Sequence, residues 1–479
     1  MTIAEPELRV LRWIKPRDED KERAQKAFED IRERMQRILS SNYSSPFDIR
    51  LQGSIAKDTW LRNDPEMDIF VIFEEEMSRE DFKKIVEKAA KEMADLNPRI
   101  SYAEHPYLTL SKDGFNIDIV PSLKMKESGR PRTAVDRTPL HTKFVLEHTD
   151  ENLRDEIRLV KAFMKGTGVY GAEVKVGGFS GYLAELLTIK FGGFRELLDE
   201  AAKWRSHVII SFESDQNTIK QLRKRYPESP MILPDPADPL RNVAAALTRK
   251  KMAELSLAST LYLERPSLYY FSQKTELLLL EEAKKLPLEI YSDHTVVLDV
   301  KLKSTPHPDI LWGELKRSSK SIRGILERNN FNVIRCDCWT DERERALIAC
   351  LIEEKMLEPL GSINGPPFFT KENSIEFLQK YMTIPMAGPW FEDDGRLHAL
   401  YIRYKRSPLQ LLKDRLDEVL AGDLKSGEIR LYRLNSEKMS AEDEASRWLL
   451  LFQIGKPRWL LPRYLQELRG ETEERVLFQ

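Results

Sequence analysis

Cysteine is scarce in this 479-residue chain. Its three cysteines, Cys336, Cys338 and Cys350, lie in one region and cannot all pair with one another. We therefore do not expect a secreted scaffold built on disulfides. Cys336 and Cys338 stand in an apolar run without a second cysteine pair or a histidine at the spacing of a zinc site. We expect all three to be structural free thiols.

Long apolar runs and an excess of one charge are also missing. No segment approaches the roughly 18 apolar residues that cross a membrane, and the first residues lack the apolar part of a secretory signal. We therefore expect a cytoplasmic protein with no membrane partner. The 76 basic and 78 acidic residues leave a formal net charge of −2. A uniformly basic nucleic-acid coat protein is excluded, and any nucleic acid must be bound by local patches.

The length predicts about three domains, at roughly 100–200 residues each. We expect a multidomain α+β protein with a mixed-sheet palm over 1–150, a helical central domain over 151–275 and an α+β C-terminal body and tail over 276–479. In the palm, the patterns predict helices over 18–40 and 81–96, strands over 47–54, 67–73, 100–110 and 115–120, and a hairpin turn at 111–114.

The later patterns predict helices in the central domain and mixed elements after it. The expected central helices are 153–165, 181–204 and 242–263, and an extended loop with five prolines, Pro227 to Pro239, precedes the last. Beyond residue 275 we expect strands over 294–302, 332–339 and 396–405 and a helix over 310–329.

Three carboxylates form the most informative pattern. Gly53-Ser54 closes one strand, and an eleven-residue spacer leads to Glu66-x-Asp68 at the start of the next. Alternate residues of a strand share a face, so Glu66 and Asp68 point away from the core-facing Met67, Ile69 and Val71. Asp118 lies in a second apolar strand, and its neighbours Ile117 and Ile119 point to the opposite face. We therefore expect the three acids on one face of the sheet.

Three acids on one face would repel one another unless a cation joins them. Oxygen ligands on a shallow sheet suit Mg²⁺, which keeps waters and takes substrate phosphates as its other ligands. Such a site serves phosphoryl transfer. Ser54 and the neighbouring backbone amides are suited to hold triphosphate oxygens. The alternative is that each acid is a solvated residue at a strand end.

The order Gly-Ser, Glu-x-Asp and a later acid resembles the polymerase-β-like nucleotidyltransferases. Within them, the chain resembles the archaeal-type CCA-adding enzymes, the tRNA nucleotidyltransferases, over roughly residues 45–270. The segments that carry this resemblance are 102–107 (YAEHPY), 134–139 (AVDRTP) with His141, 170–173 (YGAE), 178–183 (GFSGYL), 235–236 (DP) and 241–245 (RNVAA). Over the C-terminal third the resemblance is weaker.

The resemblance implies roles for individual residues. Glu66, Asp68 and Asp118 would carry the metal ions, with Asp118 nearest the hydroxyl of the RNA end. Lys57 stands where the family pattern has Arg, which would cost the contact its two-pronged geometry. The residues implied in nucleotide binding are Ser54, Lys57, Thr138, His141, Lys161 and Tyr170 for the triphosphate, and His105 and Arg241 near the base.

Two of these implied residues also have a local rationale. Lys161 lies on a helix whose Leu153, Ile157 and Val160 form an apolar side, so we expect its ammonium to face a ligand. Arg241 stands where the proline-rich loop enters the expected helix, whose N-terminus attracts anions. Each of these residues taken alone also fits a plain surface or packing position.

The C-terminal third offers a candidate RNA surface. In the helix over 310–329, Lys316, Lys320 and Arg323 share one face, and Leu315, Ile322 and Leu326 form another. Five of the eight tryptophans, Trp312, Trp339, Trp390, Trp448 and Trp459, fall after residue 275. Basic residues near aromatic ones suit RNA. A solvated charged helix and core tryptophans are the alternative.

The sequence therefore predicts addition of C, C and A to the 3′ end of tRNA from CTP and ATP. The alternatives are another RNA nucleotidyltransferase, such as a poly(A) polymerase, or a palm-fold RNA-binding protein without catalysis. The oligomeric state does not follow from the sequence, and a homodimer is kept as one alternative.

Overall fold

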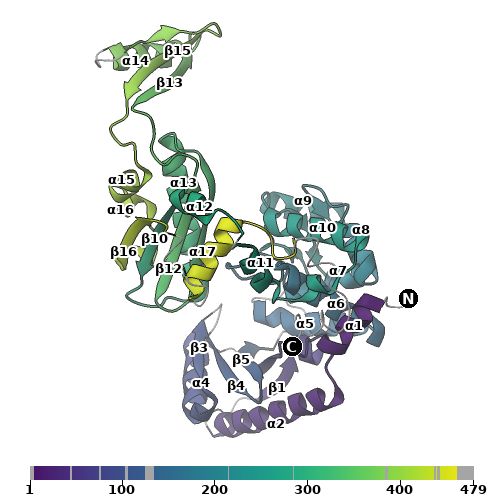
Figure 1. Cartoon of the computed structure of the whole chain (residues 1–479). Helices are drawn as coiled ribbons and strands as arrows, with labels where there is room; N and C mark the ends of the chain where they lie inside the picture. Colours follow the sequence, from purple (N-terminus) through teal and green to yellow (C-terminus); the bar gives the residue numbers. More distant parts are fainter. Residues whose placement is uncertain are drawn as a thin grey trace. The chain divides into compact units, whose positions relative to one another are not determined.

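A computed structural model shows two compact units, residues 1–278 with 456–479, and residues 279–455 (Figure 1). The structure describes residues 5–460 except 42, 44–45, 75–76, 103–105, 125–133, 214, 284, 383–386, 436–438 and 440–442. His105 lies outside the described residues. The three-domain division expected from the sequence stays a prediction.

The first unit begins with a five-stranded mixed sheet, ordered β1-β2-β5-β4-β3. Its strands are β1 (Phe47–Gln52), β2 (Glu66–Phe73), β3 (Arg99–Tyr102), β4 (Pro106–Lys112) and β5 (Phe115–Leu123). The helices of this region are α1 (Glu5–Ile14), α2 (Asp18–Ser40), α3 (Gly53–Ala56), α4 (Arg79–Glu92), the short η1 (Ala94–Leu96) and α5 (Ala134–Glu147). β5 runs parallel to β2 and antiparallel to β4. The mixed sheet of the expected palm is confirmed.

One face of this sheet is dry. Met67, Ile69 and Val71 of β2 join Ile117 and Ile119 of β5 in a core closed by the apolar sides of α2 and α4 (Figure 1). Alternation along the strands leaves the other face to the acids. The expected turn at 111–114 is present, with Asp113 and Gly114 at positive φ between β4 and β5.

The rest of the first unit is helical with short strands. Its elements are α6 (Glu151–Thr167), α7 (Gly181–Phe191), α8 (Phe194–Ala201), β6 (Val208–Ile209), α9 (Gln216–Arg225), β7 (Met231–Ile232), β8 (Pro234–Asp235), β9 (Asp238–Asn242), α10 (Arg249–Glu264) and η2 (Leu268–Phe271). Helix α11 (Thr275–Ala283) spans the boundary between the units.

The expected helix over 242–263 is wrong in its first part. Arg241 lies on β9, and α10 begins only after Thr248, whose hydroxyl accepts from the Lys251 backbone. The buried Asn242 side chain accepts from the backbone of Leu233 and Ala244, which holds this stretch in turns. The expected proline-rich loop likewise contains β7 and β8.

The second unit is built on a four-stranded antiparallel sheet, ordered β11-β12-β10-β16. A three-stranded sheet, β13-β15-β14, forms a smaller module. The strands are β10 (Thr295–Lys301), β11 (Val333–Thr340), β12 (Arg345–Ile352), β13 (Leu360–Pro367), β14 (Trp390–Phe391), β15 (Arg396–Ile402) and β16 (Glu428–Arg433). The helices are α12 (Leu288–Asp293), α13 (Pro308–Arg328), α14 (Lys371–Met382), α15 (Pro408–Lys413), α16 (Leu416–Val419), η3 (Gly422–Ser426) and α17 (Glu444–Ile454).

The free-thiol expectation is wrong for two of the three cysteines. Cys336 on β11 and Cys350 on β12 face each other in register and form a disulfide. The two residues are fourteen positions apart in the sequence, and only the strand register brings them together. Cys338 is buried outside this bond. Among the described helices, none is long and apolar enough to cross a membrane.

Candidate active site

The three predicted acids lie on the face of the sheet opposite the dry core. Glu66 and Asp68 are on β2, and Asp118 is the direct neighbour of Asp68 on β5. Adjacent strands are about 4.8 Å apart, so these two carboxylates start from neighbouring backbone positions. The Thr109 hydroxyl on β4 donates to Asp118 Oδ1 at 2.7 Å. The structure confirms the shared face.

Burial and mutual repulsion disfavour the charged forms of these acids. Burial, with the Asp118 charge next, raises the pKa of Asp68 to about 6, although Lys57 and Lys161 act in the opposite direction. Burial also raises the pKa of Glu66, helped by Asp68 and Asp118, and that of Asp118 against the hydrogen bond from Thr109. The face therefore favours a bound cation.

The donor set fits a divalent ion. Among the described side chains, none donates a hydrogen bond to Glu66 or Asp68, so their oxygens are available as ligands. Among the described residues, no group of three or more His, Cys, Asp or Glu side chains could hold a metal ion by itself. Few protein ligands completed by water and phosphate are typical of Mg²⁺.

Gly53 brings the preceding turn against these acids. It has φ +67°, which favours glycine, and a Cβ at this position would lie 1.8 Å from Asp68 Oδ2. Ser54 follows it in the short α3. The glycine of the Gly-Ser pair is therefore required by both its backbone and its neighbour.

Two predicted triphosphate ligands, Lys57 and Lys161, meet at one buried acid. Glu185 of α7 accepts from Lys57 Nζ at 2.5 Å, from Lys161 Nζ at 2.8 Å and from the Thr59 hydroxyl at 2.7 Å. Burial alone would raise the pKa of Glu185, but Lys161 and Lys57 hold it at about 2. Burial lowers the pKa of Lys161, and Glu185 opposes that shift.

Lys161 does not face open space, contrary to our expectation. Its side chain is 3% exposed, because the middle of α6 is buried on all sides and packs on α7 and η2. A buried ammonium requires a partner, and Glu185 supplies it. The role of Lys161 toward a triphosphate stays a prediction.

A second buried acid joins His141 and Arg241. Asp235 Oδ2 lies 2.9 Å from His141 Nε2 and 2.8 Å from Arg241 Nη1, and Asp235 Oδ1 accepts from the Tyr182 hydroxyl at 3.3 Å. The His141 ring stacks on Tyr182, with centroids 3.8 Å apart. Burial would raise the pKa of Asp235, but His141 leads the partners that lower it. Thr138 lies on α5, one turn before His141.

Tyr170 lines an open cleft of about 590 Å³ together with Glu66. Lys165 also lines it, with its ammonium 4.8 Å from the Tyr170 ring centre and paired with Asp64. Burial lowers the pKa of Lys165 to about 8 and raises that of Tyr170. The cleft therefore joins Glu66 to a cation and an aromatic ring, a combination that suits a nucleotide.

Known proteins match this chain along most of its length. A nucleotidyltransferase domain model matches residues 32–141, the second domain of tRNA nucleotidyltransferase matches 155–272, and the C-terminal domain of CCA-adding enzyme matches 294–426. The CCA-adding enzyme of Saccharolobus shibatae is 34% identical over 94% of this chain and 98% of its own length. That of Sulfurisphaera tokodaii is 35% identical over 96% of this chain and 100% of its own.

This chain belongs to the CCA-adding enzyme family. It is therefore a nucleotidyltransferase, as the sequence predicted. Among solved structures, the Cid1 poly(U) polymerase bound to MgGTP matches with a TM-score of 0.43 and 16% identity, over 55% of this chain and 94% of that one.

The candidate site includes three residues that sequence reasoning missed, Glu185, Asp235 and Lys165. Lys165 follows Lys161 by one helical turn, so the spacing along α6 could have indicated it. Glu185 and Asp235 stand inside segments already noted, but both are buried acids, and only the structure shows the basic groups that they contact.

The matched C-terminal domain contains the candidate RNA helix, α13. Lys316, Lys320 and Arg323 are exposed on it, and Leu315, Ile322 and Leu326 are buried, as expected. Arg323 is partly occupied, because its Nε lies 2.7 Å from Glu327 and its Nη2 donates to the Val333 carbonyl. RNA binding by this face stays a prediction.

Proposed function

We propose that this chain adds C, C and A to the 3′ end of tRNA, using CTP and ATP and releasing pyrophosphate. The observation that carries the proposal is the in-register pair Asp68 and Asp118, with Glu66 beside them, in a chain that matches CCA-adding enzymes over nearly its whole length. Glu66, Asp68 and Asp118 would hold Mg²⁺, which when bound neutralises phosphate charge and activates the attacking hydroxyl.

The chain's own residues position both reactants. Asp118, fixed by Thr109, orients the RNA 3′-hydroxyl toward the α-phosphorus. The new O–P bond forms as the bond to the pyrophosphate oxygen breaks, and the hydroxyl proton passes to solvent water. Lys57 and Lys161, whose charges act on Asp68, stabilise the triphosphate together with His141, Ser54, Thr138 and Tyr170. Arg241, held by Asp235, faces the base.

The test uses one tRNA that lacks its CCA end. We would incubate it with Mg²⁺ and each labelled nucleotide in turn, then with CTP and ATP together, and sequence the product ends. The proposal predicts two C residues followed by one A, and then a stop. A poly(A) polymerase would extend with ATP alone and continue, and an RNA-binding protein would add nothing.

We also propose a cytoplasmic location, a homodimer, Mg²⁺ as the metal ion, a division into three domains and a role for His105 in nucleotide binding. Chelation followed by titration with Mg²⁺, Mn²⁺ or Ca²⁺ in the same assay would identify the ion.

A further inference from the structure

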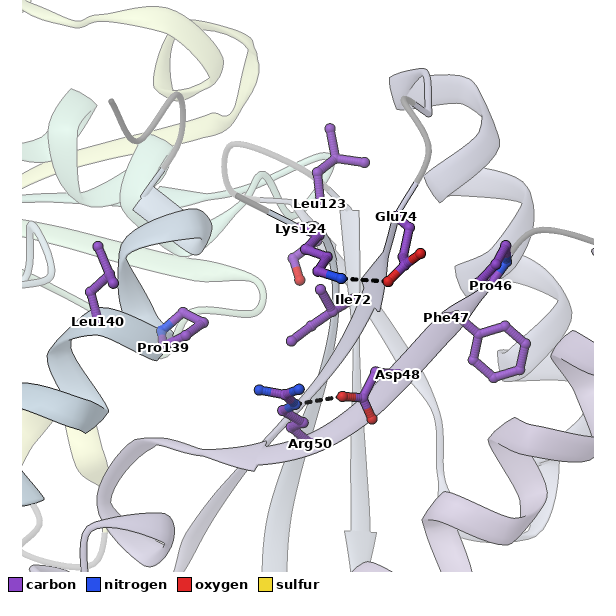
Figure 2. Close-up of a pocket in the computed structure, with 11 residues that line it drawn as sticks. Pro46, Phe47, Asp48, Arg50, Ile72, Glu74, Leu123, Lys124, Pro139 and Leu140 are labelled. Carbon is purple, nitrogen blue, oxygen red and sulfur yellow. Dashed lines mark hydrogen bonds and ion pairs between the residues drawn. The ribbon is translucent and has the colours of Figure 1, made fainter. Parts of the chain in front are cut away.

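The face of the sheet that carries the acids continues into a cavity of about 280 Å³ (Figure 2). Its floor is formed by Asp48 and Arg50 of β1, Ile72 of β2 and Ser122 of β5, and Pro139 and Leu140 of α5 form a wall. Asp48 is in register with Ile72, and Ile72 with Ser122. Asp48, Ile72 and Ser122 therefore form one row across three strands, and Arg50 lies beside it in the row of Phe70.

This row lies on the catalytic side of the sheet. Residues 68 and 72 of β2 are four apart, so they share a face and lie about 13 Å apart along the strand. Asp118 and Ser122 of β5 have the same spacing. An RNA end whose hydroxyl reaches Asp118 can thus continue along the sheet into the cavity. Stacked nucleotides rise about 3.4 Å each, so the cavity lies roughly three to four nucleotides from the reacting end.

The lining combines apolar surface with polar side chains that can leave their ion pairs to bind a ligand. Arg50 Nε donates to Asp48 at 2.5 Å, and Lys124 Nζ to Glu74 at 2.5 Å. These four side chains are 49–61% exposed, and exposed ion pairs of this kind contribute little and separate readily. Donors and acceptors around Ile72, Pro139 and Leu140 match a flat ring with a polar edge. A bare phosphate would meet as many carboxylates as cations.

The size selects a small occupant. A cavity of about 280 Å³ is at the lower end of the range for small-molecule sites, and is too small for a helix or a strand of a protein partner. We propose that this cavity, defined by Asp48, Arg50, Ile72, Glu74, Ser122, Lys124, Pro139 and Leu140, binds one unpaired nucleobase of the acceptor RNA, close behind its 3′ end. The inference rests on the proposed function, because it takes RNA as the acceptor.

The test varies the RNA and the cavity together. RNA hairpins with 3′ overhangs of one to four unpaired nucleotides, none of them ending in CCA, serve as acceptors for a single CTP or ATP addition. Ile72→Phe fills the floor, and the double variant Arg50→Ala/Lys124→Ala removes the two cations at its rim. Lys84→Ala is the matched control. The Lys84 side chain is 63% exposed, and its helix, α4, packs on the opposite, core face of the sheet.

We expect Ile72→Phe to raise the KM for RNA about tenfold with overhangs of three or four nucleotides, the effect of losing roughly one stacked base. One-nucleotide overhangs should be unaffected, as should the KM for CTP. The double variant should show the same length dependence to a smaller extent, and Lys84→Ala should behave as wild type. An abasic site at the third or fourth nucleotide should weaken the wild type and have no further effect in Ile72→Phe.

Two results would overturn the inference. One is a wild-type KM for every overhang in both cavity variants, and the other is an equal rise at all lengths, which indicates general damage. Failure of the proposed function is a separate result, since the wild type itself would then add no nucleotide to any hairpin. If Ile72→Phe does not fold, as judged by its melting curve, the surface double variant and the abasic RNAs still decide the question.

Discussion

Five acids of the candidate site fall into two groups with opposite surroundings. Glu66, Asp68 and Asp118 share a sheet face, and burial and mutual repulsion raise their pKa values. Glu185 and Asp235 are 0% exposed, yet basic partners lower their pKa values. The first group has the donor set that suits a divalent cation. The second is already paired with basic side chains of the chain itself.

Breaking the sheet-face group should have the largest effect. Asp68→Ala or Asp118→Ala should reduce nucleotide addition at least about 100-fold, because the metal ion that we propose these carboxylates hold stabilises charge that develops in the transition state. RNA affinity should stay nearly intact, since it depends on basic contacts elsewhere. Turnover and a filter-binding isotherm measure the two.

Glu87→Ala on α4, an exposed acid outside the site, is the control for these variants. The assignment of the metal-binding acids is wrong if either site variant keeps a tenth of wild-type turnover with Mg²⁺.

Breaking the Glu185 group should affect stability first. Glu185→Gln leaves Lys57 and Lys161 buried beside a neutral amide, and losing one partner of a buried ion pair costs about 3–5 kcal/mol. Urea unfolding measures the loss, and the KM for CTP should rise as the lysines shift. Glu147→Gln, which removes an exposed partner of Lys143, should change the free energy of unfolding by under about 0.5 kcal/mol. Equal effects in the two variants would contradict the distinction between the groups.

The Asp235 group is expected to control nucleotide choice. Arg241→Ala should lower the preference for CTP and ATP over UTP and GTP by about tenfold, the loss of one charge-assisted hydrogen bond. Asp235→Asn should lower it in the same direction, because Arg241 then loses its anchor. Single-turnover rates with each nucleotide measure the ratio. A ratio unchanged in Arg241→Ala removes that residue from base recognition, whatever happens to the absolute rates.

Lys165 tests the comparison between the two groups at a cation rather than an acid. Burial lowers its pKa although the charge of Glu173 raises it. With a pKa of about 8, it is charged at pH 7 and loses that charge as the pH rises through 8. The KM for CTP should therefore rise a few-fold between pH 7 and 9 in the wild type. Lys165→Arg keeps its charge over this range and should show a flat profile. Parallel profiles in the two proteins would exclude Lys165 from nucleotide binding.

The smallest effect is expected at exposed cations of the second unit. Changing Lys316, Lys320 and Arg323 to Ala should lower the slope of log K against log salt for tRNA by roughly 2, at about 0.9 per phosphate contact on duplex nucleic acid. Arg323 should contribute least, because Glu327 already pairs with it. Addition of C to a short hairpin should be unchanged. A wild-type slope in the triple variant would show that this helix face is solvated and does not bind tRNA.

The sheet face was predictable because alternation along two apolar strands fixes which side chains share it. The turn at Asp113-Gly114 was also predictable, because a turn depends on the local sequence between two strands. The pairings of Lys161 with Glu185 and of Cys336 with Cys350 depend on tertiary packing and strand register, which no local pattern contains. Arg241 was misplaced because Val243, Ala244 and Leu247 resemble a helical pattern, whereas the Asn242 side chain holds their backbone in turns.

The position of β5 in the sheet has a consequence for how the chain is made. β5 is the last of the five strands in the sequence, yet it lies between β2 and β4. Until residues 115–123 have left the ribosome, β2 and β4 each lack a neighbour and leave backbone N–H and C=O groups unpaired along one edge, the kind of edge on which chains aggregate. Nascent or truncated chains that end before Phe115 should therefore depend on chaperones, and the pair Asp68 and Asp118 forms only when the central strand is inserted.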